Sequence, residues 1–70
     1  MEKEKLLEIA NLKEQMEYYW FLCQKEKPIN RDKYIYYLSK ASNYKDLYEE
    51  ALSKAGITQE ELMLELEKIS

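Results

Sequence analysis

The stretch Lys27-Pro28-Ile29-Asn30 decides how this chain folds, because a long helical pattern stops there and a second one begins. Pro28 lacks an N–H donor and biases the residue before it away from helical angles. Asn30 is a favourable N-cap, and Ile29 and Tyr34 occupy the two positions of a hydrophobic staple around it. We therefore predict a first helix over residues 3–26 and a second helix that begins at Arg31.

The first segment carries two apolar faces. Four successive aromatic residues, Tyr18 to Phe21, point to every side of a helix, so no single neighbouring element can cover them all. Spacings of three and four define a core face, and a looser second face lies opposite. The core face contains Leu6, Ile9, Leu12, Met16, Tyr19, Trp20 and Cys23, and the second face contains Leu7, Ala10, Tyr18, Phe21 and Leu22.

The second segment, residues 31–55, keeps one apolar face in phase up to Gly56, a residue suited to the left-handed position after a helix. Ser42 and Asn43 are weak helix formers, and Asn43 with Asp46 imitates a capping pair, so a break near 42–43 is an open alternative. The predicted core face is Tyr34, Tyr37, Leu38, Ala41, Tyr44, Tyr48, Leu52 and Ala55.

A third helix is predicted over residues 59–69. Thr58-Gln59-Glu60-Glu61 is a capping box, and Ile57 with Leu62 completes a staple. Its core face is Leu62, Leu66 and Ile69, with Met63 beside it and Leu64 facing away.

Composition supports an all-α fold. The 70 residues include 46% hydrophobic residues but only one glycine and one proline, whereas β-rich folds need many turn residues. Two helices of similar length joined by a short link fold as an antiparallel hairpin. We predict a single helical domain over residues 1–70, a small bundle made of a long antiparallel helical hairpin plus a short C-terminal helix. It has three helices, or four if the second breaks.

The run Ala55 to Leu62 resembles the opening of the helix-turn-helix in phage-repressor-type DNA-binding domains. In that family a recognition helix follows and enters the major groove. We expect no recognition helix after this run within the 70 residues, and we interpret the run as a cap and a staple.

Catalysis has little support in the sequence. Histidine is absent, there is no Gly-rich phosphate loop, and Cys23 has no base to activate it. The dense glutamates of residues 60–67 fit a solvated helix face. We expect no enzyme, catalytic residue, cofactor, metal or small-molecule substrate. The single cysteine, the lack of a signal peptide and the lack of a long apolar run predict a cytoplasmic protein without a membrane segment.

What remains is binding to protein. Aromatic residues make up 13% of the chain, more than one small bundle can bury, and they are enriched at interfaces. We expect a protein-protein interaction module of a bacterium or phage, a regulator, inhibitor or adaptor that binds a larger protein or forms a homodimer. Alternatively, the third helix covers Phe21 and Leu22 but is too short to reach Leu7 as well. The interface candidates are Leu7, Tyr18, Phe21, Leu22 and Tyr36.

A less favoured alternative is binding of single-stranded nucleic acid. Residues 25–45 contain six basic and two acidic residues, interleaved with tyrosines, although the whole chain has net charge −3. Cations can follow phosphates and rings can stack on bases. The candidates are Lys27, Arg31, Lys33, Tyr36, Lys40 and Lys45.

Overall fold

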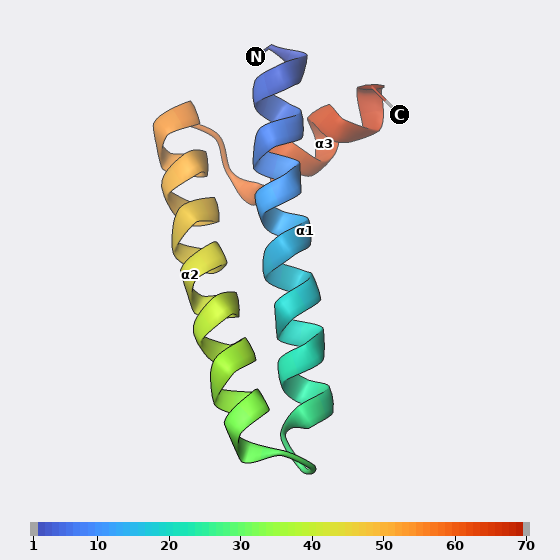
Figure 1. The fold of residues 1–70 in the computed structure, drawn as a ribbon. Coiled ribbons are helices and arrows are strands. Elements are labelled where there is room, and N and C mark those ends of the chain that lie inside the picture. Colours follow the sequence, from blue (N-terminus) through green and yellow to red (C-terminus); the bar gives the residue numbers. More distant parts are fainter. Residues whose placement is uncertain (1, 70) are drawn as a thin grey trace.

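A computed structural model describes residues 2–69 of the chain as three helices (Figure 1). They are α1 (Lys3–Glu26), α2 (Arg31–Ala55) and α3 (Gln59–Ile69). The first two lie antiparallel along the 41 Å length of the molecule, and α3 crosses behind α1 near its N-terminal end (Figure 1). The fold is therefore the predicted hairpin with a short third helix, a small helical bundle.

The second helix is continuous, so the possible break at 42–43 is absent. Ser42 and Asn43 are exposed. At an exposed helix position, a weak helix former lowers the free energy of unfolding by roughly a few tenths of a kcal/mol relative to a good one. The residues on either side of the pair are held by packing, because Ala41 is buried and the Tyr44 ring stacks on α1. Tertiary contacts outweigh the local preference here.

The link between α1 and α2 has the predicted cap. The side-chain oxygen of Asn30 accepts a hydrogen bond from the Lys33 N–H at 3.1 Å, and the backbone N–H of Asn30 reaches the Glu26 carbonyl at 2.9 Å. Ile29 contributes little to the expected staple, since it is one of the most exposed large side chains.

Gly56 ends α2 with φ of 68°, in the left-handed region. The Ile57 N–H bonds to the Leu52 carbonyl and the Gly56 N–H to the Ser53 carbonyl, which is the Schellman arrangement. The capping box of α3 follows directly. The Thr58 N–H donates to Glu61 Oε1 at 3.2 Å, and the Glu61 N–H donates to Thr58 Oγ1 at 3.1 Å.

The main core lies at the end of the hairpin that α3 crosses. Leu6, Ile9, Tyr48 and Leu62 are buried there and come from all three helices. Partly buried side chains surround them: Leu12, Met16, Ala51, Leu52, Ala55, Ile57 and Leu66. Ile69, predicted as core, is exposed because it ends α3 beyond the hairpin.

The position of α3 rules out the alternative in which the third helix covers Phe21. It does not cover Phe21, which is 63% exposed, because an antiparallel hairpin places the end of α2 beside the beginning of α1. A short helix that follows α2 can reach only that end. Leu7 lies at that end but is still exposed.

The half of the hairpin nearer the turn has a thin core. Cys23 is fully buried, with its Sγ 3.8 Å from the Tyr34 carbonyl, and Ala41 is buried as well. Trp20, predicted as core, is 51% exposed. None of the helices described in residues 2–69 packs on its side of α1 at that height, and this is the clearest departure from the sequence prediction.

Among residues 2–69, no helix is long and apolar enough to cross a membrane.

Candidate protein-interaction surfaces

The five interface candidates lie at different places on the hairpin. Tyr18 and Tyr36 are 57% and 56% exposed, and Leu22 is half-buried. Phe21 lies one residue from Trp20 on another side of α1, and Leu7 lies three turns of α1 before Tyr18. The candidates therefore do not form one surface.

Tyr18 and Tyr36 belong to a chain of rings that joins the two long helices. Tyr19 stacks on Tyr44 with centroids 5.6 Å apart and planes inclined by 6°. Tyr18 meets Tyr19 edge-on at 5.3 Å, Tyr19 lies 6.3 Å from Tyr37, and Tyr36 meets Tyr37 edge-on at 5.4 Å. We name these five residues, Tyr18, Tyr19, Tyr36, Tyr37 and Tyr44, the tyrosine cluster.

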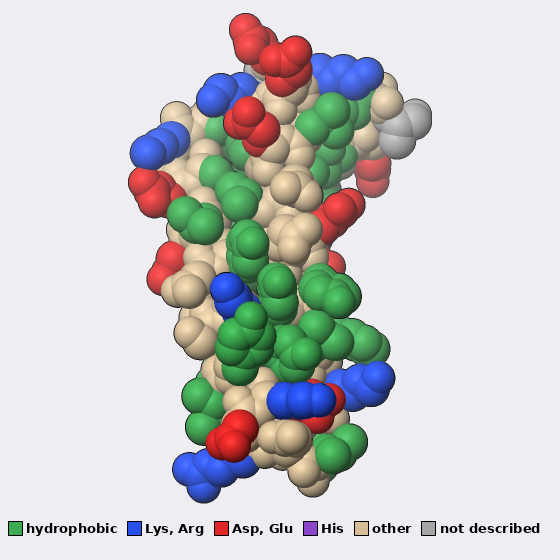
Figure 2. Space-filling view, viewed as in Figure 1, with side chains coloured by type: hydrophobic (Ala, Val, Ile, Leu, Met, Phe, Trp, Pro, Cys, Tyr) green, Lys and Arg blue, Asp and Glu red, His purple; other side chains and the backbone are tan. Residues whose placement is uncertain are grey.

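The side of the hairpin opposite α3 presents apolar side chains to solvent. Figure 1 shows α3 behind the hairpin, and Figure 2 shows, from the same side, a band of hydrophobic side chains that runs along the junction of α1 and α2. The band is densest in the half nearer the turn, where the rings of the tyrosine cluster join the two helices. Such apolar bands on small proteins mark association surfaces.

A second feature is an open groove of about 680 Å³ between α1 and α2. Its apolar wall includes Met16, Trp20, Phe21 and Ala41, with Gln24 and Ser42 beside them. Its two charged lining residues are Glu17 on α1 and Lys45 on α2. We name this set of residues the tryptophan groove. Residue spacing does not reveal this groove, because Trp20 and Ala41 both fit the core faces of their helices.

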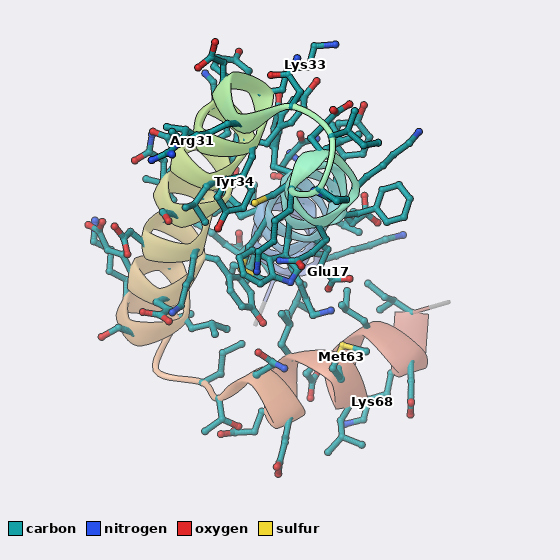
Figure 3. The ribbon with its side chains drawn as sticks, turned by 90° about the horizontal axis from the view of Figure 1, so that it is seen from below. Glu17, Arg31, Lys33, Tyr34, Met63 and Lys68 are labelled. Carbon is teal, nitrogen blue, oxygen red and sulfur yellow. The ribbon has the colours of Figure 1, made fainter. Side chains whose placement is uncertain are left out.

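The tryptophan groove is on the side of the hairpin where α3 lies. Figure 3 views the molecule along the hairpin and shows Glu17 projecting from α1 on the side of α3. Glu17 pairs with Lys13, one turn earlier on α1. Met63 lies on the edge of α3 that faces the hairpin (Figure 3).

The basic candidates lie around the turn and along α2. Lys27, Arg31 and Lys33 are exposed, and none has an ion-pair partner within residues 2–69. Lys40 Nζ lies 5.7 Å from the centre of the Tyr36 ring, and Lys45 Nζ is 4.0 Å from Glu49. Lys40 and Lys45 thus contact neighbouring side chains, whereas Lys27, Arg31 and Lys33 project into solvent around the turn.

One buried polar group stands out. The Tyr48 hydroxyl is buried in the main core without a hydrogen-bond partner among the described residues. Burial raises the pKa of Tyr48 above its ordinary value of 10.0, while Lys13 opposes this shift and Glu17 adds to it. A tyrosine that stays protonated and unpartnered is not poised for acid-base chemistry near neutral pH.

No three histidine, cysteine, aspartate or glutamate side chains in residues 2–69 lie close enough together to hold a metal ion.

Comparisons with protein-family models, with curated proteins and with solved structures find no match to this chain.

Proposed function

We propose that this chain is a non-enzymatic protein-protein interaction module, and that the tyrosine cluster is its surface for a larger protein partner. The observation that carries the proposal is the exposure of Tyr18 and Tyr36 at either end of a connected set of rings. Tyrosine supplies a large rigid contact area at low cost in side-chain entropy. A regulator, inhibitor or adaptor of a bacterium or phage fits this surface.

The geometry favours binding because the outer rings are already supported. Tyr18 rests against Tyr19, and Tyr36 rests against Tyr37. The two inner rings lie 6.3 Å apart across the helix pair. An interface that is ordered before binding loses less conformational entropy when the partner arrives.

The test compares capture of proteins from a lysate of the source cells by the wild-type chain and by the double variant Tyr18→Ala with Tyr36→Ala. We expect the wild type to retain a defined partner and the variant to lose it, with helical circular dichroism unchanged. Leu64→Ala is the matched control, because Leu64 is 58% exposed but belongs to α3. Equal capture by the double variant would refute the assignment of this surface.

Binding of single-stranded nucleic acid is the second candidate, favoured by the basic side chains of Lys27, Arg31 and Lys33 around the turn, which have no ion-pair partner among residues 2–69. Against it, Lys40 is close to the ring of Tyr36 that a base would need. Fluorescence anisotropy with a labelled oligonucleotide at about 50 mM salt, where phosphate contacts are strong, tests it. No change in anisotropy would remove this candidate.

A further inference from the structure

The tryptophan groove lies on the same face of the hairpin as the surface on which α3 packs. Ile9 is buried in the cluster that contains Leu62 of α3, and Trp20 follows Ile9 by eleven residues, about three helical turns. The two side chains therefore project from α1 in nearly the same direction. One is covered by α3 and the other is 51% exposed, so α3 fills only part of a longer apolar face.

We propose that a second copy of this chain occupies the tryptophan groove, antiparallel to the first, so that α1 packs on α1 and α2 on α2 about a two-fold axis. This inference goes beyond the proposed function, because it names a partner at a second surface that is separate from the tyrosine cluster. Figure 1 shows α3 at one end of the hairpin only, so a parallel arrangement would bring the two α3 helices to the same height on the facing sides, where we expect them to collide. The antiparallel arrangement places them at opposite ends.

The lengths agree with this arrangement. The distance along the helix axis of α1 from Trp20 to Pro28, where the turn lies, is about 12 Å. The same distance from Trp20 toward the N-terminus reaches Leu12, which packs in the cluster beneath α3. With the two-fold axis at the height of Trp20, the turn of the second copy ends where α3 of the first begins to cover the hairpin. The open part of the face is filled without a clash.

The charges agree as well. Residues 25–33 contain four basic and two acidic residues, whereas α3 contains four glutamates and one lysine. The antiparallel pairing brings the basic turn of each copy beside the acidic α3 of the other, and the two-fold axis repeats this contact. Complementary charge of this kind selects orientation and accelerates association.

Apolar anchors supply the remaining contact. Trp20 and Phe21 lie close to the proposed axis, so each copy offers the same pair to the other. Met63 is exposed on the edge of α3 that faces the hairpin (Figure 3). Large apolar side chains at the centre with charges outside them form the usual plan of a stable interface.

The first test measures mass by light scattering and the emission of Trp20 over a wide concentration range. Trp20 is the only tryptophan, so its emission reports on the groove alone. We expect a mass twice the chain's 8.5 kDa and a blue shift as the dimer forms. Trp20→Ala should be a helical monomer, and Tyr18→Ala should remain a dimer. A wild-type monomer with solvent-exposed Trp20 at every concentration would overturn the proposal.

The second test uses charge reversal. Arg31 precedes Ser42 by eleven residues and so shares the groove side of α2. Arg31→Glu and Glu60→Lys should each weaken the dimer roughly tenfold, and the chain that carries both should recover. These residues lie at opposite ends of one chain, so only contact between copies explains recovery. Lys33→Glu is the matched control, since Lys33 is on the side away from α3 (Figure 3). A double variant without recovery refutes the antiparallel arrangement.

The two proposals fail separately. If the chain is monomeric but still captures a partner that depends on Tyr18 and Tyr36, the dimer is refuted and the proposed function stands. If the dimer forms through Trp20 but the tyrosine variants change no binding, the assignment of the tyrosine cluster fails. A monomer that binds a different protein through Trp20 also refutes the second copy as the occupant.

Discussion

The ring of Tyr19 on α1 stacks almost parallel on the ring of Tyr44 on α2, with centroids 5.6 Å apart. This contact joins the long helices in the half of the hairpin that α3 does not cover. Among the residues that the structure describes, that half fully buries only Cys23 and Ala41, both small. The stacked pair therefore substitutes for the large buried side chains found at the other end.

We expect the two rings to be energetically coupled. Tyr19→Ala and Tyr44→Ala should each lower the free energy of unfolding, and the double variant should lose less than the sum of the two. The difference should be about 0.5–1.5 kcal/mol, as for other aromatic pairs. Urea denaturation followed by circular dichroism measures it. Strict additivity would mean that the rings are neighbours without a stabilising contact.

Tyr48→Phe should stabilise the protein by about 1 kcal/mol at neutral pH. The substitution keeps the buried ring and removes a hydroxyl that has no hydrogen-bond partner among the described residues. Urea denaturation at pH 7 compares the two proteins. A loss of stability would show that the hydroxyl is satisfied, for example by a bound water.

The stability difference between these two proteins should also depend on pH. Burial raises the pKa of Tyr48 in the folded protein above that of the unfolded chain. The folded state therefore holds this proton where the unfolded state has lost it, and the wild type loses stability as the pH rises through about 10. Other tyrosines and lysines titrate in both proteins and cancel in the comparison. The advantage of Tyr48→Phe should grow from pH 7 to about pH 11, and a constant difference would contradict the raised pKa.

How much of this fold the sequence predicts depends on whether a signal is local. The cap at Asn30, the left-handed Gly56 and the capping box at Thr58 each depend on residues within one turn, and all three are present. These local signals fix where the helices begin and end, and the all-α hairpin follows from those boundaries. Sequence spacing also left Tyr36 off the core face of α2, and its ring is exposed.

Trp20 shows where such prediction stops. Periodicity reports the direction in which a side chain leaves the helix axis, and Trp20 does project near the direction of Ile9. It does not report whether another element lies at that height. The height of α3 follows from the lengths of α1 and α2 and from the antiparallel path. Weighing those lengths would have placed α3 over Leu6 and Ile9, and left Trp20 and Phe21 open.

Gly56→Ala should lower the free energy of unfolding by about 1 kcal/mol, because alanine is strained at a φ of 68°. A Cβ at this position would have no atom within 4 Å, so crowding adds nothing. Ser53→Ala is a suitable control, since Ser53 is exposed within the last turn of α2 and alanine favours helix there. Thermal denaturation of the two variants separates them, and equal midpoints would contradict the importance of the left-handed cap.

The attachment of α3 should depend on Leu62 far more than on Leu64. Leu62 is fully buried between Leu6, Ile9 and Tyr48, whereas Leu64 faces solvent two residues later on the same helix. Leu62→Ala should cost about 2–5 kcal/mol, the range for large buried side chains, and Leu64→Ala should stay within about 0.5 kcal/mol of the wild type. Both substitutions remove the same atoms, so helix propensity does not distinguish them.

A small domain has only a few kcal/mol of net stability, so Leu62→Ala should release α3 or unfold the chain. Amide hydrogen exchange distinguishes these outcomes. Release of α3 alone would speed exchange over residues 59–69 and leave α1 and α2 protected, while global unfolding would speed exchange everywhere. Equal exchange in the Leu62→Ala and Leu64→Ala proteins would mean that α3 is not held by its buried leucine, and the main core would then have to be assigned to the hairpin alone.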